Sequence, residues 1–165
     1  MSHAEPAALD VRRILRALVA RGVDFVVIGG IAAVLHGSAR TTFDLDLAFS
    51  QDAANREALA RVLLDLNARL RGVSEDVPFT PDARALHEIE VLTLATDAGD
   101  LDVLARPAGA PPYARLRARA DRYDLGGFAV LVAGLPDLIA MKRAAGRPKD
   151  LADVEELETI LRLGA

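Results

Sequence analysis

The sequence predicts an α/β (α+β) fold in which a mixed or antiparallel sheet is flanked by helices. Helical and strand patterns alternate through the first half of the chain. Glycine-containing turns at residues 97–99 and 126–127 each separate two strand candidates, which is typical of hairpins. Because hairpins join antiparallel strands, the pattern disfavours a doubly wound parallel sheet.

Apolar spacing and glycine stops predict the elements of the first half. Leu9, Ile14, Leu15 and Leu18 form a helical stripe, whereas a run of β-branched and aromatic residues after Gly22 indicates a buried strand. Five elements are expected here: a helix over 7–21, a strand over 24–28, a short helix over 31–36, a strand over 43–47 and a helix over 53–70.

The second half is expected to contain two hairpins and two C-terminal helices. A Pro-rich break over 107–112 and an Arg-rich segment over 113–122 separate the hairpins. Pro148 suits a first helical turn, and Asp150 and Asp153 favour its positive end. The expected elements are strands over 88–95, 100–104, 123–125 and 128–132, followed by helices over 136–144 and 148–163.

Composition predicts one globular domain over residues 1–165. The chain is 52% hydrophobic and contains no cysteine, which excludes a disulfide framework and a thiolate metal site. It shows neither a basic-then-apolar leader nor an apolar run long enough to span a bilayer, so we expect a cytoplasmic protein without a membrane partner. A net charge of −4 argues against indiscriminate nucleic-acid binding.

Two aspartates in the run Phe43-Asp44-Leu45-Asp46-Leu47 provide the clearest functional signal. Side chains alternate along a strand, so Phe43, Leu45 and Leu47 are expected in the core and both aspartates on the other face. Like charges repel there, and a hard cation such as Mg²⁺ would offset them. An amphipathic edge strand with a solvated acidic face is the alternative interpretation.

Two further features fit a site for a polyphosphate and a metal. Asp102 alternates with apolar residues in a later strand and is the candidate for a third carboxylate, with Asp100 as its rival on the same face. Upstream, Gly29-Gly30 joins a strand to a short helix, and glycine lets a phosphate approach the backbone closely.

Two stretches resemble a known superfamily. Residues 25–49 carry Gly29-Gly30, His36-Gly37, Arg40, Thr42 and Asp44-Leu45-Asp46, and residues 137–157 carry Lys142, Gly146-Arg147 and Lys149-Asp150. Together they resemble the nucleotidyltransferase superfamily, whose fold is similar to DNA polymerase beta. Within it they resemble the minimal nucleotidyltransferases and the AbiEii-type toxins. Gly29-Gly30 stands where the superfamily usually has glycine-serine.

The resemblance implies a role for each residue. Asp44 and Asp46 would hold two Mg²⁺ ions, and Asp102 would share one ion and help deprotonate the acceptor hydroxyl. Gly29 and Gly30 would cradle the phosphates. The triphosphate would be neutralised by Lys142, assisted by Arg147 or Lys149.

The resemblance also implies a reaction: transfer of NMP from an NTP to a hydroxyl. The acceptor would be a tRNA 3′ end or a protein, and the enzyme would be the toxin of a toxin–antitoxin system with a cognate antitoxin. Two alternatives stay open: transfer to a small molecule such as an aminoglycoside, and an inactive relative that binds a nucleotide or partner without turnover.

The remaining polar residues have structural interpretations. His36 is expected to pack beside the Gly37 turn, and Asp150 to partner a helix dipole. Arg40 is expected to anchor the acidic strand from outside the metal site, with a contact to the substrate as the alternative. Four arginines are expected to form a solvated face, with a patch for the phosphates of an RNA acceptor as the alternative. They are Arg115, Arg117, Arg119 and Arg122.

Overall fold

The computed structural model describes residues 5–73, 79–87 and 89–164. Within them the chain forms one mixed seven-stranded sheet with six helices. The helices are α1 (Val11–Ala20), α2 (Gly29–Leu35), α3 (Ala53–Asp65), α4 (Tyr113–Ala118), α5 (Leu135–Ala145) and α6 (Pro148–Gly164). The strands are β1 (Phe25–Ile28), β2 (Asp44–Phe49), β3 (Arg69–Leu70), β4 (Leu92–Thr96), β5 (Gly99–Leu104), β6 (Asp121–Asp124) and β7 (Ala129–Val132).

The sheet has the order β3-β4-β5-β2-β1-β7-β6. The pairs β2–β5 and β1–β7 are parallel, and the other neighbours are antiparallel. Two of the antiparallel pairs are the expected hairpins, β4–β5 and β6–β7. The predicted mixed sheet flanked by helices is therefore confirmed.

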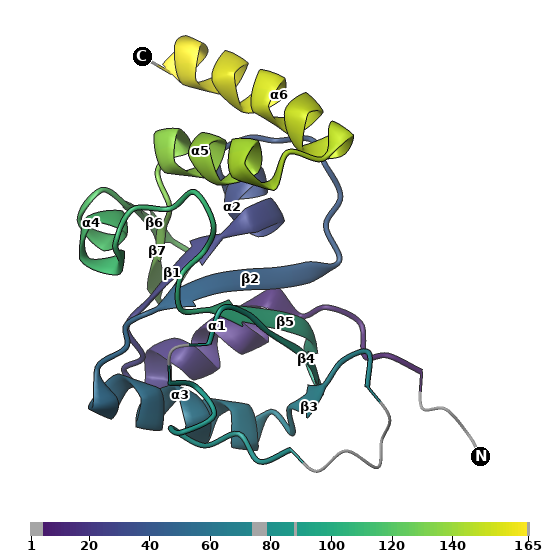
Figure 1. Ribbon diagram of the computed structural model, residues 1–165, viewed down its shortest axis with the longest axis vertical. Helices are drawn as coiled ribbons and strands as arrows, with labels where there is room; N and C mark the ends of the chain where they lie inside the picture. The colour runs from purple at the N-terminus through teal and green to yellow at the C-terminus, as the bar shows by residue number, and fades with distance from the viewer. Residues whose placement is uncertain (1–4, 74–78, 88, 165) are drawn as a thin grey trace.

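Helices cover both faces of the sheet. In Figure 1, α1 and α3 lie together below the central strands, whereas α2, α5 and α6 are stacked above them with α6 outermost. The central strands contribute the fully buried side chains of Leu45, Leu47, Leu101 and Val103 to the core. Alternation along β2 and β5 consequently turns Asp44, Asp46, Asp100 and Asp102 to the opposite face. None of the helices in the described ranges is long and apolar enough to cross a membrane.

Several predicted boundaries are wrong. Helix α3 ends at Asp65 rather than residue 70, because Asn67 adopts a left-handed backbone (φ 52°) that turns Arg69–Leu70 into an edge strand. Phe43 was expected in the core, but it precedes β2 and its side chain is 81% exposed. Glu88, where a strand was expected to begin, lies outside the described residues, and the strand begins at Leu92.

Other boundaries differ by a few residues. Helix α1 begins at Val11 rather than residue 7, because Asp10 caps it by accepting a hydrogen bond from the Arg13 backbone N–H at 3.1 Å. Helix α2 begins at Gly29, so Gly29 and Gly30 lie in its first turn rather than before it. Strand β6 begins at Asp121, two residues earlier than expected.

Candidate functional site

Three carboxylates converge on the face of the sheet that carries α2. The parallel register of β2 and β5 pairs Asp44 with Asp100 and Asp46 with Asp102. One oxygen each from Asp44, Asp46 and Asp102 lies within 4.8 Å of the other two. The structure therefore brings together the three carboxylates that the sequence predicted as metal ligands.

The charges in this triad are poorly compensated. Burial, the negative charges of Asp44 and Asp102, and a hydrogen bond with Asp102 raise the pKa of Asp46 to about 7, against an opposing effect of Lys142. Burial also raises the pKa of Asp102, although Arg71 opposes it. Three converging carboxylate oxygens, whose charge Arg71 and Lys142 offset only in part, are a fitting donor set for Mg²⁺. The residues present therefore fit a divalent metal ion.

Asp100, the rival for the third ligand, is placed differently. Its carboxylate is not among the three that converge, and its Oδ2 lies 3.5 Å from Nη1 of Arg71. Asp100 pairs with Asp44 across the two strands, two residues along the strands from the pair of Asp46 and Asp102. The geometry thus favours Asp102 over Asp100 as the third carboxylate.

Arg71 is a site residue that sequence reasoning missed. Its Nη2 lies 2.9 Å from Oδ1 of Asp102 and 4.0 Å from Oδ2 of Asp44. Sequence gave no usable signal, because the expected helix through residue 70 hid the edge strand that delivers this side chain. Only the pairing of β3 with β4 brings Arg71 near the carboxylates.

Two glycines let the turn after β1 approach the carboxylates. Gly29 has φ +69°, and a Cβ there would lie 2.9 Å from Cγ of Asp46. A Cβ on Gly30 would lie 2.9 Å from Cβ of Thr42. Any other residue at position 29 would thus adopt a strained backbone and displace a candidate metal ligand.

A cavity of about 450 Å³ extends from the triad to α5 and α6. It is lined on one side by Gly29, Gly30 and the triad, and on the other by Lys142, Arg147 and Lys149. The structure therefore brings all eight sequence-predicted site residues to one cavity.

Acidic side chains of α6 hold two of these cations. Lys142 Nζ lies 3.0 Å from Oδ2 of Asp153 and 3.6 Å from Oδ1 of Asp150. Arg147 Nε donates to Oδ2 of Asp150 at 2.7 Å, and this hydrogen bond lowers the pKa of Asp150. Within the described ranges Lys149 forms no ion pair. Of these three cations, Lys142 and Arg147 are thus held by aspartates that are fully or nearly buried.

The loop that precedes β2 is tied to α6. Ser38 Oγ donates to Glu156 at 2.5 Å, and Arg40 Nε lies 2.5 Å from Oδ1 of Asp153. Arg40 was expected to anchor the acidic strand; its partner lies on α6 instead. The structure thus joins α6 to the loop that leads into Asp44.

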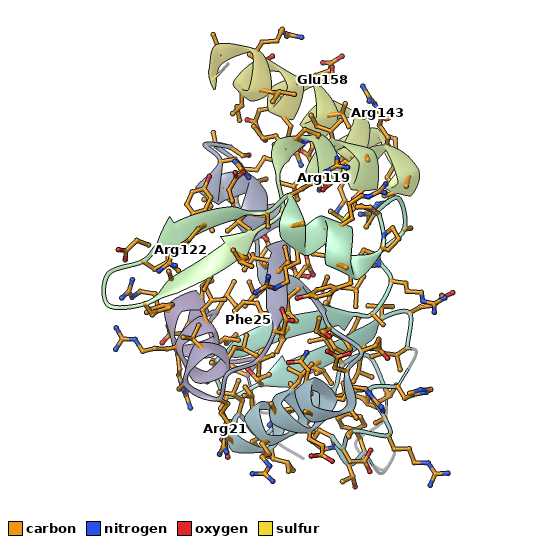
Figure 2. The ribbon with its side chains drawn as sticks, turned by 90° about the vertical axis from the view of Figure 1, so that its left-hand side faces the viewer. Arg21, Phe25, Arg119, Arg122, Arg143 and Glu158 are labelled. Carbon is orange, nitrogen blue, oxygen red and sulfur yellow. The ribbon has the colours of Figure 1, made fainter. Side chains whose placement is uncertain are left out.

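The other predicted structural residues lie away from the cavity. His36 Nε2 donates to the backbone oxygen of Ala133 at 2.8 Å, and its Nδ1 accepts from the Tyr123 hydroxyl at 3.1 Å, in agreement with a structural role. Arg119 donates to the buried Asp137 at 2.8 Å, and in Figure 2 it lies on the face that also carries Arg122. Arg115 and Arg122 are exposed and form no ion pair within the described residues.

Comparison with known proteins places this geometry in a family. The family model described as "Nucleotidyl transferase AbiEii toxin, Type IV TA system" matches residues 13–163. A search of curated proteins finds no match.

Several solved structures share the fold at low sequence identity. The lincosamide antibiotic adenylyltransferase LnuA with bound lincomycin is 15% identical, with a TM-score of 0.61 over 93% of this chain and 99% of that one. ANT(2″)-Ia in complex with adenylyl-2″-tobramycin is 18% identical, with a TM-score of 0.55 over 91% of each chain. The putative nucleotidyltransferase TM1012 from Thermotoga maritima is 16% identical, with a TM-score of 0.53 over 98% of each chain.

Proposed function

This chain belongs to the AbiEii nucleotidyl transferase toxin family, and we propose that it transfers NMP from an NTP to an acceptor hydroxyl in a metal-dependent reaction. One observation carries the proposal: three carboxylates from two strands converge beside a glycine turn, in a cavity that is also lined by Lys142, Arg147 and Lys149. A triphosphate needs this combination of metal ligands and positive charge.

The three carboxylates would have different roles in metal binding and in deprotonation of the acceptor. Asp44 and Asp46 would hold two Mg²⁺ ions, with Asp102 as a ligand to the ion near the acceptor. When bound, these ions would neutralise charge on the attacking and leaving oxygens of the displacement. Asp102 would also help to deprotonate the acceptor hydroxyl.

The transfer itself is an exchange of bonds at the α-phosphorus. The acceptor oxygen would form a bond to this phosphorus, and the bond to the bridging oxygen would break, so that pyrophosphate leaves. The backbone of Gly29 and Gly30 would approach the phosphates closely. Lys142 would neutralise the triphosphate with help from Arg147 or Lys149, all of which line the same cavity.

We propose that the acceptor is a tRNA 3′ end or a protein hydroxyl, and that the enzyme is the toxin of a toxin–antitoxin pair. The family match supports this role. ANT(2″)-Ia and LnuA bind antibiotics, but their similarity to this chain is limited to the fold. A small-molecule acceptor is therefore an outcome for the experiment to detect.

The test incubates the protein and Mg²⁺ with each α-labelled NTP and a total cell extract. We expect label from at least one NTP to enter RNA or protein, and Asp46→Asn to abolish it because one metal-binding charge is lost. Asp65→Asn is the matched control, since Asp65 is exposed and pairs with Arg21 far from the cavity. Nucleotide binding without transfer to RNA, protein or small molecules would contradict the proposal and favour an inactive relative.

A further inference from the structure

Arg71 reaches the carboxylates because of its register in the sheet. Its backbone N–H donates to the oxygen of Thr93 at 3.0 Å, and β4 pairs Thr93 with Asp102, which β5 pairs with Asp46. Residues in one row of a sheet present their side chains to the same face. Arg71 therefore continues the row of the two central carboxylates and extends across β4 towards them.

The guanidinium bridges the carboxylates of β5. One nitrogen, Nη2, contacts Asp102 Oδ1 at 2.9 Å, and the other, Nη1, lies 3.5 Å from Asp100 Oδ2. Nη1 also donates to the backbone oxygen of Leu94 at 3.3 Å, which fixes the plane of the group. The side chain is only 32% exposed, so these contacts are partly shielded from water.

These contacts leave the two carboxylates of β5, Asp102 and Asp100, with different capacities to bind a cation. One oxygen of Asp102 is engaged by Arg71, so a single oxygen remains for a cation. Asp100 is neutralised by the same guanidinium, although it lies next to Asp44 and could otherwise add a fourth ligand. The guanidinium is a rigid planar fork whose separate nitrogens engage the two carboxylates in fixed directions, whereas an ammonium is a single point of charge on a flexible stem.

We propose that Arg71 is a positioning residue that selects Asp102 over Asp100 as the third metal ligand and restricts Asp102 to one coordinating oxygen. This inference rests on the proposed metal-dependent transfer. It has a consequence that distinguishes it from a merely structural role. Removal of a positive charge from this face strengthens attraction for a divalent cation, while the loss of geometry impairs the chemistry.

The test compares Arg71→Gln with Arg69→Gln. Arg69 lies on the same edge strand but pairs with the exposed Asp97 at 3.7 Å, so its variant is a matched control. Binding of Mn²⁺, as a spectroscopic probe, is titrated by electron paramagnetic resonance without nucleotide. NMP transfer is assayed separately with Mg²⁺.

We expect Arg71→Gln to bind Mn²⁺ about tenfold more tightly than the wild type and to lose about 100-fold in kcat. Addition of Asp100→Asn to this variant should return the Mn²⁺ affinity towards the wild-type value, because the surplus carboxylate is removed. Arg71→Lys, which keeps the charge, should bind Mn²⁺ within about threefold of the wild type yet transfer more slowly, since a flexible ammonium does not reproduce the fixed planar geometry of the guanidinium. Arg69→Gln should change neither measurement.

Unchanged or weaker Mn²⁺ binding by a folded Arg71→Gln, as checked by circular dichroism, would overturn the inference. So would an absence of Mn²⁺ binding to both the wild type and this variant. If Arg71→Gln does not fold, Arg71→Lys decides: wild-type kcat there would refute the bridging role. A wild type that binds Mn²⁺ but transfers nothing would contradict the proposed function, while the affinities would still test the selection of Asp102.

Discussion

Replacement of Asp46 by Asn should stabilise the metal-free protein. The carboxyl of Asp46 is crowded by Asp44 and Asp102, and its pKa of about 7 lies above the ordinary value of 3.8. The folded state therefore binds a proton more tightly than the unfolded state, so folding stability decreases as the pH rises from about 4 to about 7. Asn removes the charge with little change in volume, so the variant should not lose folding stability in this way as the pH rises.

The expected gain in stability follows from the rise in the pKa of Asp46. Expressed fully as folding free energy, a pKa raised from 3.8 to about 7 costs about 4 kcal/mol above pH 7. Because the cavity is open to water, screening reduces the expected cost to about 1–2 kcal/mol. For a chain of 165 residues this corresponds to a rise in Tm of roughly 2–8 °C for Asp46→Asn at pH 8.

The assay is thermal unfolding in EDTA at pH 5 and pH 8, followed by a repeat with Mg²⁺. The wild type should be less stable at pH 8 than Asp46→Asn and should recover on addition of Mg²⁺, whereas the variant should gain little. Asp65→Asn corrects for the general effect of one charge fewer. If Asp46→Asn is no more stable than the wild type at pH 8 in EDTA, the crowding of charge inferred for the triad is wrong.

Three further outcomes are expected. Gly29→Ala should lower transfer at least 100-fold, since its Cβ would displace the Asp46 carboxylate; Gly37→Ala, with φ +113° but open space around its Cβ, should cost about 1 kcal/mol of stability and retain kcat. Lys142→Met should raise the KM for NTP about tenfold, measured by initial rates, and an unchanged KM would remove Lys142 from the triphosphate site. His36→Ala should lower the unfolding free energy by about 1–3 kcal/mol in urea titrations, because it leaves the buried oxygen of Ala133 unpaired, and a loss of kcat in the folded variant would contradict its structural role.

The predictable part of the fold is its local alternation. Leu45, Leu47, Leu101 and Val103 are buried as the period of two requires, and this alone turns the carboxylates to the other face. Local reasoning failed at Leu70, whose spacing continues the helical stripe of α3, although a left-handed residue at Asn67 ends the helix first. A backbone reversal at a non-glycine residue leaves little trace in apolar periodicity.

The candidate site was predictable to the same extent. Asp44, Asp46 and Asp102 carry their own signal, because each is an acidic residue within an apolar strand. Arg71 does not, since its position depends on the register between β3 and β4. The pairing of Lys142 with Asp150 and Asp153 likewise depends on how α5 packs against α6. Contacts between elements that are distant in sequence decide these partners, and no local pattern specifies them.

The parallel pairing of β2 with β5 has a consequence during synthesis. Asp44 and Asp46 leave the ribosome long before Asp102, and a nascent chain that has not reached β5 holds only two of the three carboxylates. Lys142 follows later still, on α5. On the proposed mechanism every truncated translation product that stops short of α5 is inert, so the chemistry waits until both β5 and α5 have been synthesised.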